Sequence, residues 1–339
     1  MGQVCCHPPH GVRGVTLDGQ VEVSEPLYTS STSSLSRKFQ STLERVDEDI
    51  REDDRTTASG PASPGEGDDE QADIEALFLE TKASIEADTV NPDSMSDWKD
   101  ISKPTARVHY KTKSAPARDC VCMLIETRDQ VKTFPLLQME QGQIKSGVIP
   151  TFWSVRYWPL WFPFCTSVEL LKQYSPSNFI IHVKLTILFF VVDFIVYCGI
   201  KNNLDHNGTI EVIIKSPPPG SEGTQWFGIE VPALSGRLPR VCMECGLLIF
   251  KPKTLTEIWV KMHMELRETP APNWVKVFAF QQLAIRILPE LVKFQEKLPR
   301  TALGKYLGSG MELESRDWLI NLHNSIREYV AREKDASVT

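Results

Sequence analysis

The spacing of apolar and polar residues divides this 339-residue chain into three parts. Residues 1–70 are rich in Ser, Thr, Gly, Pro and acidic side chains and have too few apolar groups to form a core, so we expect a disordered tether. Between residues 73 and 85, apolar residues recur at helical spacing and predict a short amphipathic helix that ends before Asn91-Pro92. We therefore expect a tether at 1–70, a folded domain at 71–298 and a C-terminal amphipathic helix and tail at 299–339.

Short apolar runs bounded by turn residues predict an antiparallel sheet in the middle of the chain. One hairpin is nearly explicit, because Asp193–Ile200 and Thr209–Lys215 flank the turn signal Asn207-Gly208. Residues Phe134–Ile149 have helical spacing and predict a helix ahead of an aromatic-rich segment. Further strands are expected at Ala106–Lys113, Val121–Glu126, Cys165–Leu171, Phe179–Thr186, Arg240–Phe250 and Leu255–Leu266.

The domain ends in a long apolar segment, Asn273–Lys297, which predicts a helix with a kink at Pro289. An antiparallel sheet needs one face covered, and a helix gripped by a curved sheet satisfies that need. The predicted fold class is α+β, with a curved antiparallel sheet around this helix. A further amphipathic helix is expected within Met311–Glu333, either packed back on the domain or contacting a membrane or a protein partner.

The distribution of charge and the cysteine content exclude some classes of protein. The net charge is −7, and residues 1–70 contain 14 acidic against 6 basic side chains, while the remainder is close to neutral. Because Lys and Arg are not clustered, we expect no nucleic-acid partner. Eight cysteines are too dilute for a disulfide framework, and the N-terminus lacks the apolar core of a secretory signal, so we expect reduced thiols in the cytosol. The apolar run Leu185–Ile200 is too short to span a membrane and contains Asp193, so we expect strands there, or a strand and an apolar loop.

The first six residues carry an acylation signal. Removal of Met1 would expose Gly2 for N-myristoylation, and Cys5 and Cys6 stand where palmitoylation commonly follows. One acyl chain binds a membrane only marginally, and a second makes the attachment stable. The usual signature has Ser or Thr at position 6, and the alternative is that both cysteines are plain terminal thiols. We expect the protein at the cytosolic face of a membrane, or in the cytoplasm if it is not acylated.

Other motifs resemble metal-binding, redox or catalytic sites, but their spacing or sequence context does not fit such a site. Cys242 and Cys245 form a CxxC pair, but residues i and i+3 of a strand point to opposite faces, and no second pair accompanies them. We expect no metal or redox site there or at Cys120 and Cys122. The chain has no phosphate-binding loop, nucleophile elbow or HExxH motif, so we expect neither a cofactor nor catalysis.

Charged and imidazole side chains interrupt several of the apolar strands. A group of this kind is expensive to bury unpaired, so an inward-facing one would have to meet a partner or a lipid head group. The alternative for each is that strand alternation turns it toward solvent. The residues concerned are His182, Lys184, Asp193, Arg240, Glu244 and His263.

The order of motifs between Trp98 and Leu298 resembles the START (steroidogenic acute regulatory protein-related lipid-transfer) domain. Two departures are Val192, where the family usually has Arg, and ELRETPAPNW from residue 265 in place of an Asp-Pro-Gly-Gly sequence. The resemblance implies a helix-grip fold around a tunnel for one lipid, with binding and transfer rather than catalysis. It rests on Trp98, VHYK from residue 108, WPLWFPFCTSVELL from residue 158, DFIVY from residue 193, Arg240, GLL from residue 246, and Pro270–Trp274.

The resemblance also implies where ligand and membrane would bind. The family's tunnel mouth follows the strand matching Phe179–Leu185, which implies a membrane-contacting loop at Leu188, Phe189 and Phe190, although this apolar stretch could instead extend a strand. The ligand would be a phospholipid, a sterol or a sphingolipid. The candidate ligand-binding residues are His182, Asp193, Tyr197, Arg240, Glu244, His263, Trp161 and Phe278.

Two functions follow from these expectations. The first is an acyl-anchored lipid-transfer protein that carries one lipid between the anchoring membrane and a nearby one. The second is a membrane-tethered lipid sensor or scaffold that binds a protein partner through residues 299–339. A bound partner that is lost on removal of those residues, with little transfer activity, would distinguish the second from the first.

Overall fold

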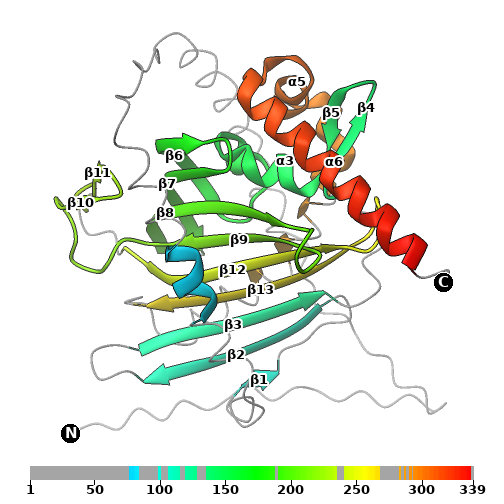
Figure 1. Ribbon diagram of the computed structural model, residues 1–339. Coiled ribbons are helices and arrows are strands. Elements are labelled where there is room, and N and C mark those ends of the chain that lie inside the picture. The colour runs from blue at the N-terminus through cyan, green and yellow to red at the C-terminus, as the bar shows by residue number, and fades with distance from the viewer. Residues whose placement is uncertain are drawn as a thin grey trace, which may run out of the picture. The chain divides into compact units, whose positions relative to one another are not determined.

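A large antiparallel sheet organises the chain (Figure 1). The computed structural model describes residues 76–83, 98–100, 106–114, 119–127, 135–187, 190–234, 240–267, 282–283, 286–287, 290–291 and 293–336. Within these residues, nine strands form one sheet in the order β1 (Lys99–Asp100), β2 (Ala106–Ser114), β3 (Asp119–Thr127), β13 (Ile258–Arg267), β12 (Cys242–Pro252), β9 (Thr209–Lys215), β8 (Phe190–Asn203), β7 (Asn178–Ile187) and β6 (Cys165–Ser175).

The predicted strands are all present. β2, β3, β6 and β7 run one to four residues longer than the sequence indicated, β8 extends further at both ends, β9 has the predicted bounds, and β12 and β13 begin later than predicted. The hairpin predicted around Asn207-Gly208 joins β8 to β9, with Asn203 paired to Thr209 and Gly208 at φ 72°. Glycine suits this position because a positive φ is costly for residues with a Cβ. The apolar stretch after β7 extends the strands: Ile187 pairs with Phe190 at the start of β8.

The helix predicted over Phe134–Ile149 is wrong. The segment forms a hairpin of β4 (Gln138–Glu140) and β5 (Gln143–Ser146), and helix α3 (Val148–Trp153) starts only at its end. The turn residues Gln141 and Gly142 have φ of 50° and 75°, the left-handed pair that joins two strands tightly. Over so few residues, helical spacing and strand alternation are hard to tell apart, and the Gln-Gly turn decides between them.

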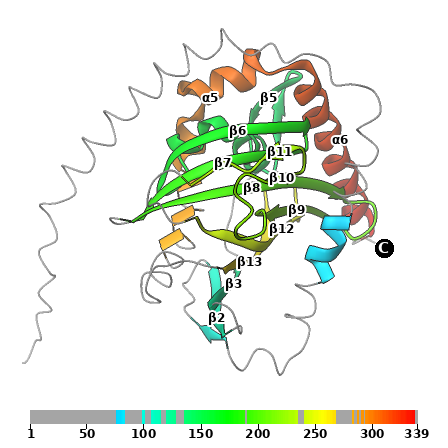
Figure 2. The same ribbon diagram turned by 90° about the vertical axis from the view of Figure 1, so that its left-hand side faces the viewer.

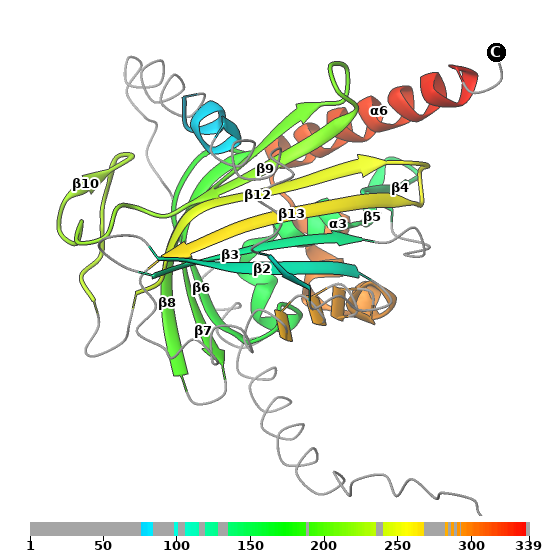
Figure 3. The ribbon, with the colours of Figure 1, turned by 90° about the horizontal axis from the view of Figure 1, so that it is seen from below.

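The sheet is strongly curved, and its two faces differ (Figure 3). α3 lies inside the curve, where the Trp153 ring packs edge-on against Phe179 at 4.9 Å. Because side chains alternate along a strand and paired residues share a face, the register assigns every strand position to one of the two faces. We call the face that carries Phe179 the concave face and the opposite one the convex face.

The convex face is covered by helical residues 76–83 and by a loop with the short strands β10 (Gln225–Trp226) and β11 (Ile229–Glu230) (Figures 1 and 3). Leu77 and Phe78 join a buried cluster with Tyr197 and other residues of this face, and Phe227 stacks on the Tyr197 ring at 5.8 Å. Lys82 donates to Glu211 at 3.1 Å, which fixes the helix over β9. The amphipathic helix predicted before Asn91-Pro92 is therefore present over its described residues.

The C-terminal part is helical. Within the predicted segment Asn273–Lys297, the described residues 282–283, 286–287, 290–291 and 293–297 are helical, and Ile287, Leu291 and Phe294 are buried. The chain continues through η3 (Leu298–Arg300), α5 (Ala302–Lys305) and η4 (Tyr306–Gly310) to the long helix α6 (Leu313–Ala336).

α6 packs back on the domain beside the β8–β9 hairpin (Figure 2). The Trp318 ring of α6 lies 5.9 Å from the Trp153 ring. Arg332 of α6 donates at 2.6 Å to Asp205, which lies in the β8–β9 turn. Leu319, Leu322 and Ile326 are buried along one side. No helix among the described residues is both long and apolar enough to cross a membrane.

Several predictions concern residues outside those described. They are the tether at 1–70 with its acylation signal at Gly2, Cys5 and Cys6, the kink at Pro289, the ligand contact of Phe278, and the tip residues Leu188 and Phe189. Phe190 is described only as the first position of β8. These expectations stay predictions.

Candidate functional site

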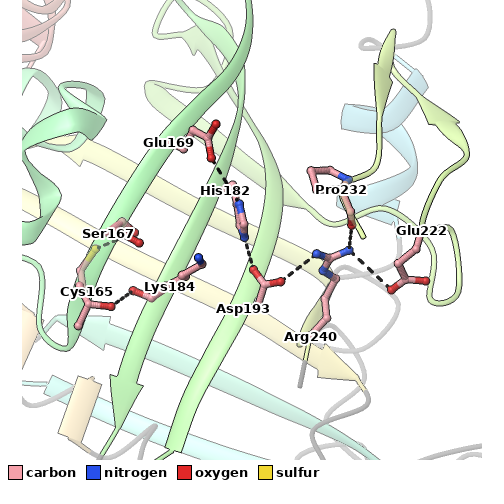
Figure 4. Close-up of polar contacts among 10 residues, drawn as sticks. Cys165, Ser167, Glu169, His182, Lys184, Asp193, Glu222, Pro232 and Arg240 are labelled. Atoms are coloured by element: carbon pink, nitrogen blue, oxygen red, sulfur yellow. Dashed lines mark hydrogen bonds and ion pairs between the residues drawn. The ribbon is translucent and has the colours of Figure 1, made fainter. Parts of the chain in front are cut away.

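Three of the predicted polar residues meet in one buried network on the convex face (Figure 4). Asp193 of β8 is only 1% exposed and accepts from two sides: from Nε2 of His182 on β7, and from Nη2 of Arg240 at 2.8 Å. Arg240 directly precedes β12 and forms a bridge with Asp193, whose carbonyl oxygen accepts from the Val241 amide at 2.8 Å. The network therefore joins three segments of the chain at the end of the sheet.

Outer partners complete the network. Arg240 Nη1 donates to the Pro232 carbonyl at 2.7 Å and lies 3.6 Å from the Glu222 carboxylate, both in the loop that carries β10 and β11. His182 Nδ1 lies 3.7 Å from the exposed Glu169 carboxylate on β6. Arg240 thus holds the loop against the sheet. Sequence reasoning missed Glu222 and Pro232 because they lie in an irregular loop, and it missed Glu169 because its nearness to His182 depends on the pairing of β6 with β7.

The electrostatics of Asp193 follow from its partners. Burial by itself would raise the pKa of this carboxyl, since it removes water from the charged form. The hydrogen bonds and charges of His182 and Arg240 outweigh burial, and the pKa of Asp193 lies below its ordinary value of 3.8. The carboxylate is therefore ionised and paired at neutral pH, which is the arrangement that makes a buried charge tolerable.

The remaining predicted ligand residues lie apart from this network. Tyr197 is buried on the convex face and donates to Asn178 at 2.6 Å. Glu244 stands at the irregularity in β12 and pairs with Arg267 at 3.2 Å. Trp161 packs edge-on against Phe152 at 4.9 Å in the helical region near α3. The structure thus does not gather the candidates into one pocket, and their ligand-binding roles stay predictions.

His263 also lies on the convex face, in a second buried cluster. Its ring is 6.2 Å from that of Trp98, the residue that marks the beginning of the predicted domain. Cys245 of β12 and Glu265 of β13 lie beside it, and both are buried. Sequence reasoning named His263 but not its neighbours, which the strand alternation of β13 and its pairing with β12 would have found.

The concave face has the opposite character. Among strand residues that the register places on it and whose side chains the structure describes, the charged one is the exposed Lys99 of the edge strand β1. By contrast, His182, Asp193, Glu211 and Glu265 all stand on the convex face. Its surface is built from aliphatic, aromatic and sulfur-containing side chains. Examples spread over five strands are Ile181, Val183, Val196, Val212, Leu248 and Met264.

Two thiols on the concave side are chemically inert. Burial raises the pKa of the Cys165 thiol to about 12, and it raises the pKa of Cys198 as well. A thiol with a raised pKa stays protonated at neutral pH and is a poor nucleophile. The concave face therefore offers apolar contact rather than reactive groups.

Comparisons with known proteins bear on the fold alone. No family model matches the sequence, and no curated protein matches it. The structure is similar to human STARD10 (9% identity, 73% of this chain and 84% of that one, TM-score 0.46) and to human StAR-related lipid transfer protein 5 (12%, 67% and 96%, 0.45). It is also similar to the Zhui aromatase/cyclase of Streptomyces sp. R1128 (9%, 58% and 98%, 0.32).

The second of these structures is a lipid transfer protein by name, and the third is an aromatase/cyclase by name. The predicted α+β class is confirmed by the large antiparallel sheet and the helical C-terminal part of the described chain. Because all three similarities are distant, the function is argued below from this chain's own faces and contacts.

Proposed function

We propose that this protein binds one lipid against the concave face of its sheet and transfers it between membranes. The observation that carries the proposal is the separation of charge between the two faces. A lipid chain or ring system is bound by apolar contact with few placed polar groups. The uncharged concave positions of five adjacent strands, β7, β8, β9, β12 and β13, curved around α3, supply such a surface.

The composition of the concave face suits an irregular hydrophobic ligand. Met262 and Met264 stand side by side along β13, and methionine is flexible enough to adapt its shape to different neighbours. The helical residues Ile287, Leu291 and Phe294 are buried and would close the lipid from solvent. The name of StAR-related lipid transfer protein 5 is consistent with this class of ligand.

We also propose that acyl chains at the N-terminus anchor the protein to a membrane. Acylation at Gly2, Cys5 and Cys6 would hold the protein at a membrane, and the acidic segment that follows would give it reach. The tip of the β7–β8 hairpin, with Leu188 and Phe189, would then contact the bilayer during lipid uptake. Gly2→Ala is expected to release the protein from membranes in a fractionation experiment.

The direct test uses the full-length chain and a photo-crosslinkable lipid that labels the residues it contacts. The protein is incubated with vesicles of phosphatidylcholine, phosphatidylethanolamine, cholesterol and ceramide that include a phosphatidylcholine with a diazirine on one acyl chain. Native mass spectrometry is expected to find one lipid per chain, and after photolysis the adducts should map to concave positions such as Met264 or Val183. Absence of bound lipid, or adducts on convex positions such as Leu247, would overturn the proposal.

Two adjacent residues of β12 give a matched pair of variants. Leu248 faces the concave side and Leu247 the convex side, and both are buried to a similar degree. Leu248→Trp and Leu247→Trp should each destabilise the fold by about 1–3 kcal/mol through overpacking. Only Leu248→Trp should also lower the vesicle-to-vesicle transfer rate, by about tenfold for each 1.4 kcal/mol of lost lipid binding. Equal transfer rates for the two variants would show that the concave face does not hold the lipid.

A further inference from the structure

The second buried cluster of the convex face combines three kinds of metal-binding atom. Cys245 lies on β12 and pairs in register with Glu265 on β13, and His263 stands two residues from Glu265 on the same face. The Cys245 Sγ, one His263 ring nitrogen and one Glu265 carboxylate oxygen all lie within 4.8 Å of one another. The Sγ to Oε2 distance is 3.8 Å.

The cluster is deeply buried. Cys245, His263 and Glu265 are 3%, 2% and 7% exposed, and both ring nitrogens of His263 are shielded from solvent. Two strands fix the three side chains, so their positions are set by the backbone pairing of β12 and β13 rather than by a loop. This differs from a surface group of acidic residues, in which each side chain is free to turn away.

We propose that Cys245, His263 and Glu265 bind a divalent transition metal of the zinc type. Thiolate, imidazole and carboxylate are the ligands that Zn²⁺ takes in proteins, at about 2.0–2.3 Å from the metal. Such bond lengths place ligand atoms roughly 3.5 Å apart around a tetrahedral ion. The separations, which are at most 4.8 Å, would therefore need to contract by at most about 1.3 Å, which rotation of the Cys and Glu side chains can supply.

Charge balance supports this assignment. On binding, the Cys245 thiol releases its proton to solvent, and one thiolate with one carboxylate cancels the two positive charges of the ion. A neutral assembly costs far less to bury than separate ions do. The neighbouring cation, Lys111, is directed toward the Trp98 ring, 4.9 Å from its centre.

The three side chains come from two neighbouring strands. Cys245 of β12 is the register partner of Glu265 of β13, so a metal held by the cluster would join these two strands. The ligands come from neighbouring strands, and for this reason the CxxC spacing of Cys242 and Cys245 is not the relevant pattern: the Cys242 thiol donates to the Pro217 carbonyl instead.

The test uses the full chain with Cys5→Ser and Cys6→Ser, because those terminal thiols could bind metal themselves. The protein is stripped with a chelator and reloaded with Zn²⁺ or Co²⁺ alone. We expect one metal per chain by elemental mass spectrometry, the intense visible absorption of tetrahedral Co²⁺ with a thiolate charge-transfer band, and quenching of Trp98 fluorescence by Co²⁺. X-ray absorption of the zinc form should find at least one sulfur together with nitrogen or oxygen ligands.

Variants then locate the metal. Cys245→Ser and Glu265→Gln should each lower the zinc affinity at least tenfold, while Cys198→Ser, a buried thiol on the concave face, should leave it unchanged. If Cys245→Ser does not fold, the X-ray absorption spectrum of the protein with an intact cluster still shows whether the zinc has a sulfur ligand. A folded protein that binds no stoichiometric metal, a zinc shell without sulfur, or affinity unchanged in both cluster variants would overturn the proposal. Lipid binding on the other face is not required for any of these results.

Discussion

The two faces of the sheet bury different kinds of side chain. The concave face packs through uncharged side chains except at the exposed edge residue Lys99, while the convex face buries Asp193, Glu211, His263 and Glu265. Apolar packing is tolerant of shape, whereas a buried charge needs fixed partners. The comparison indicates that specific polar pairs on the convex face fix the fold, and that the concave face has the apolar character that the proposed lipid site requires.

The largest loss of stability that tests this difference between the faces is expected on substitution of Asp193. Asp193→Ala leaves Arg240 and His182 without their shared carboxylate, and removing one partner of a buried ion pair costs about 3–5 kcal/mol. Urea unfolding followed by tryptophan fluorescence measures the change. Glu169→Gln is the control, because its carboxylate is largely exposed and should matter little. A loss below about 1 kcal/mol for Asp193→Ala would mean that the network does not hold the convex face together.

A smaller effect is expected at Glu211, which fastens residues 76–83 to β9. This buried carboxylate accepts from Lys82 at 3.1 Å, from Asn203 at 2.9 Å and from Asn207 at 3.1 Å. Glu211→Ala leaves the buried Asn203 amide without this acceptor and should cost about 1–3 kcal/mol.

The matched control for Glu211 is Lys82→Ala. Because the Lys82 side chain is more than a third exposed, its loss should cost below about 1 kcal/mol. Hydrogen exchange is the more local measurement, since amides of residues 76–83 should exchange faster in Glu211→Ala than in Lys82→Ala. Equal exchange in the two variants would contradict the role given to the carboxylate.

The smallest expected effect is the pH dependence that Asp193 contributes. Its folded-state pKa lies below the ordinary 3.8, so its stabilisation is complete above that value and is lost as the pH falls through the lowered folded pKa. The difference in unfolding free energy between wild type and Asp193→Asn should therefore shrink between about pH 5 and about pH 2. Urea midpoints of both proteins across this range provide the check, and a constant difference would mean that Asp193 titrates normally.

Sequence reasoning succeeded where the signal is local. Alternation and the Asn207-Gly208 turn predicted β8, β9 and their hairpin, since both are properties of a few consecutive residues. It failed at residues 138–146, where helical spacing competed with a Gln-Gly turn, and it did not foresee β10 and β11, which are two residues long. It also named His182, Asp193 and Arg240 without predicting that they meet, and it named His263 without Glu265.

The sequence by itself determined the strands and which positions within each strand share a face, because side chains alternate with a period of two. Only the tertiary structure decided which strands became neighbours. The Asp193–Arg240 pair spans 47 positions, and Cys245 meets His263 only because β12 and β13 pair in one particular register. A shift of one residue would turn every side chain to the other face, so these sites depend on long-range pairing that no local pattern encodes.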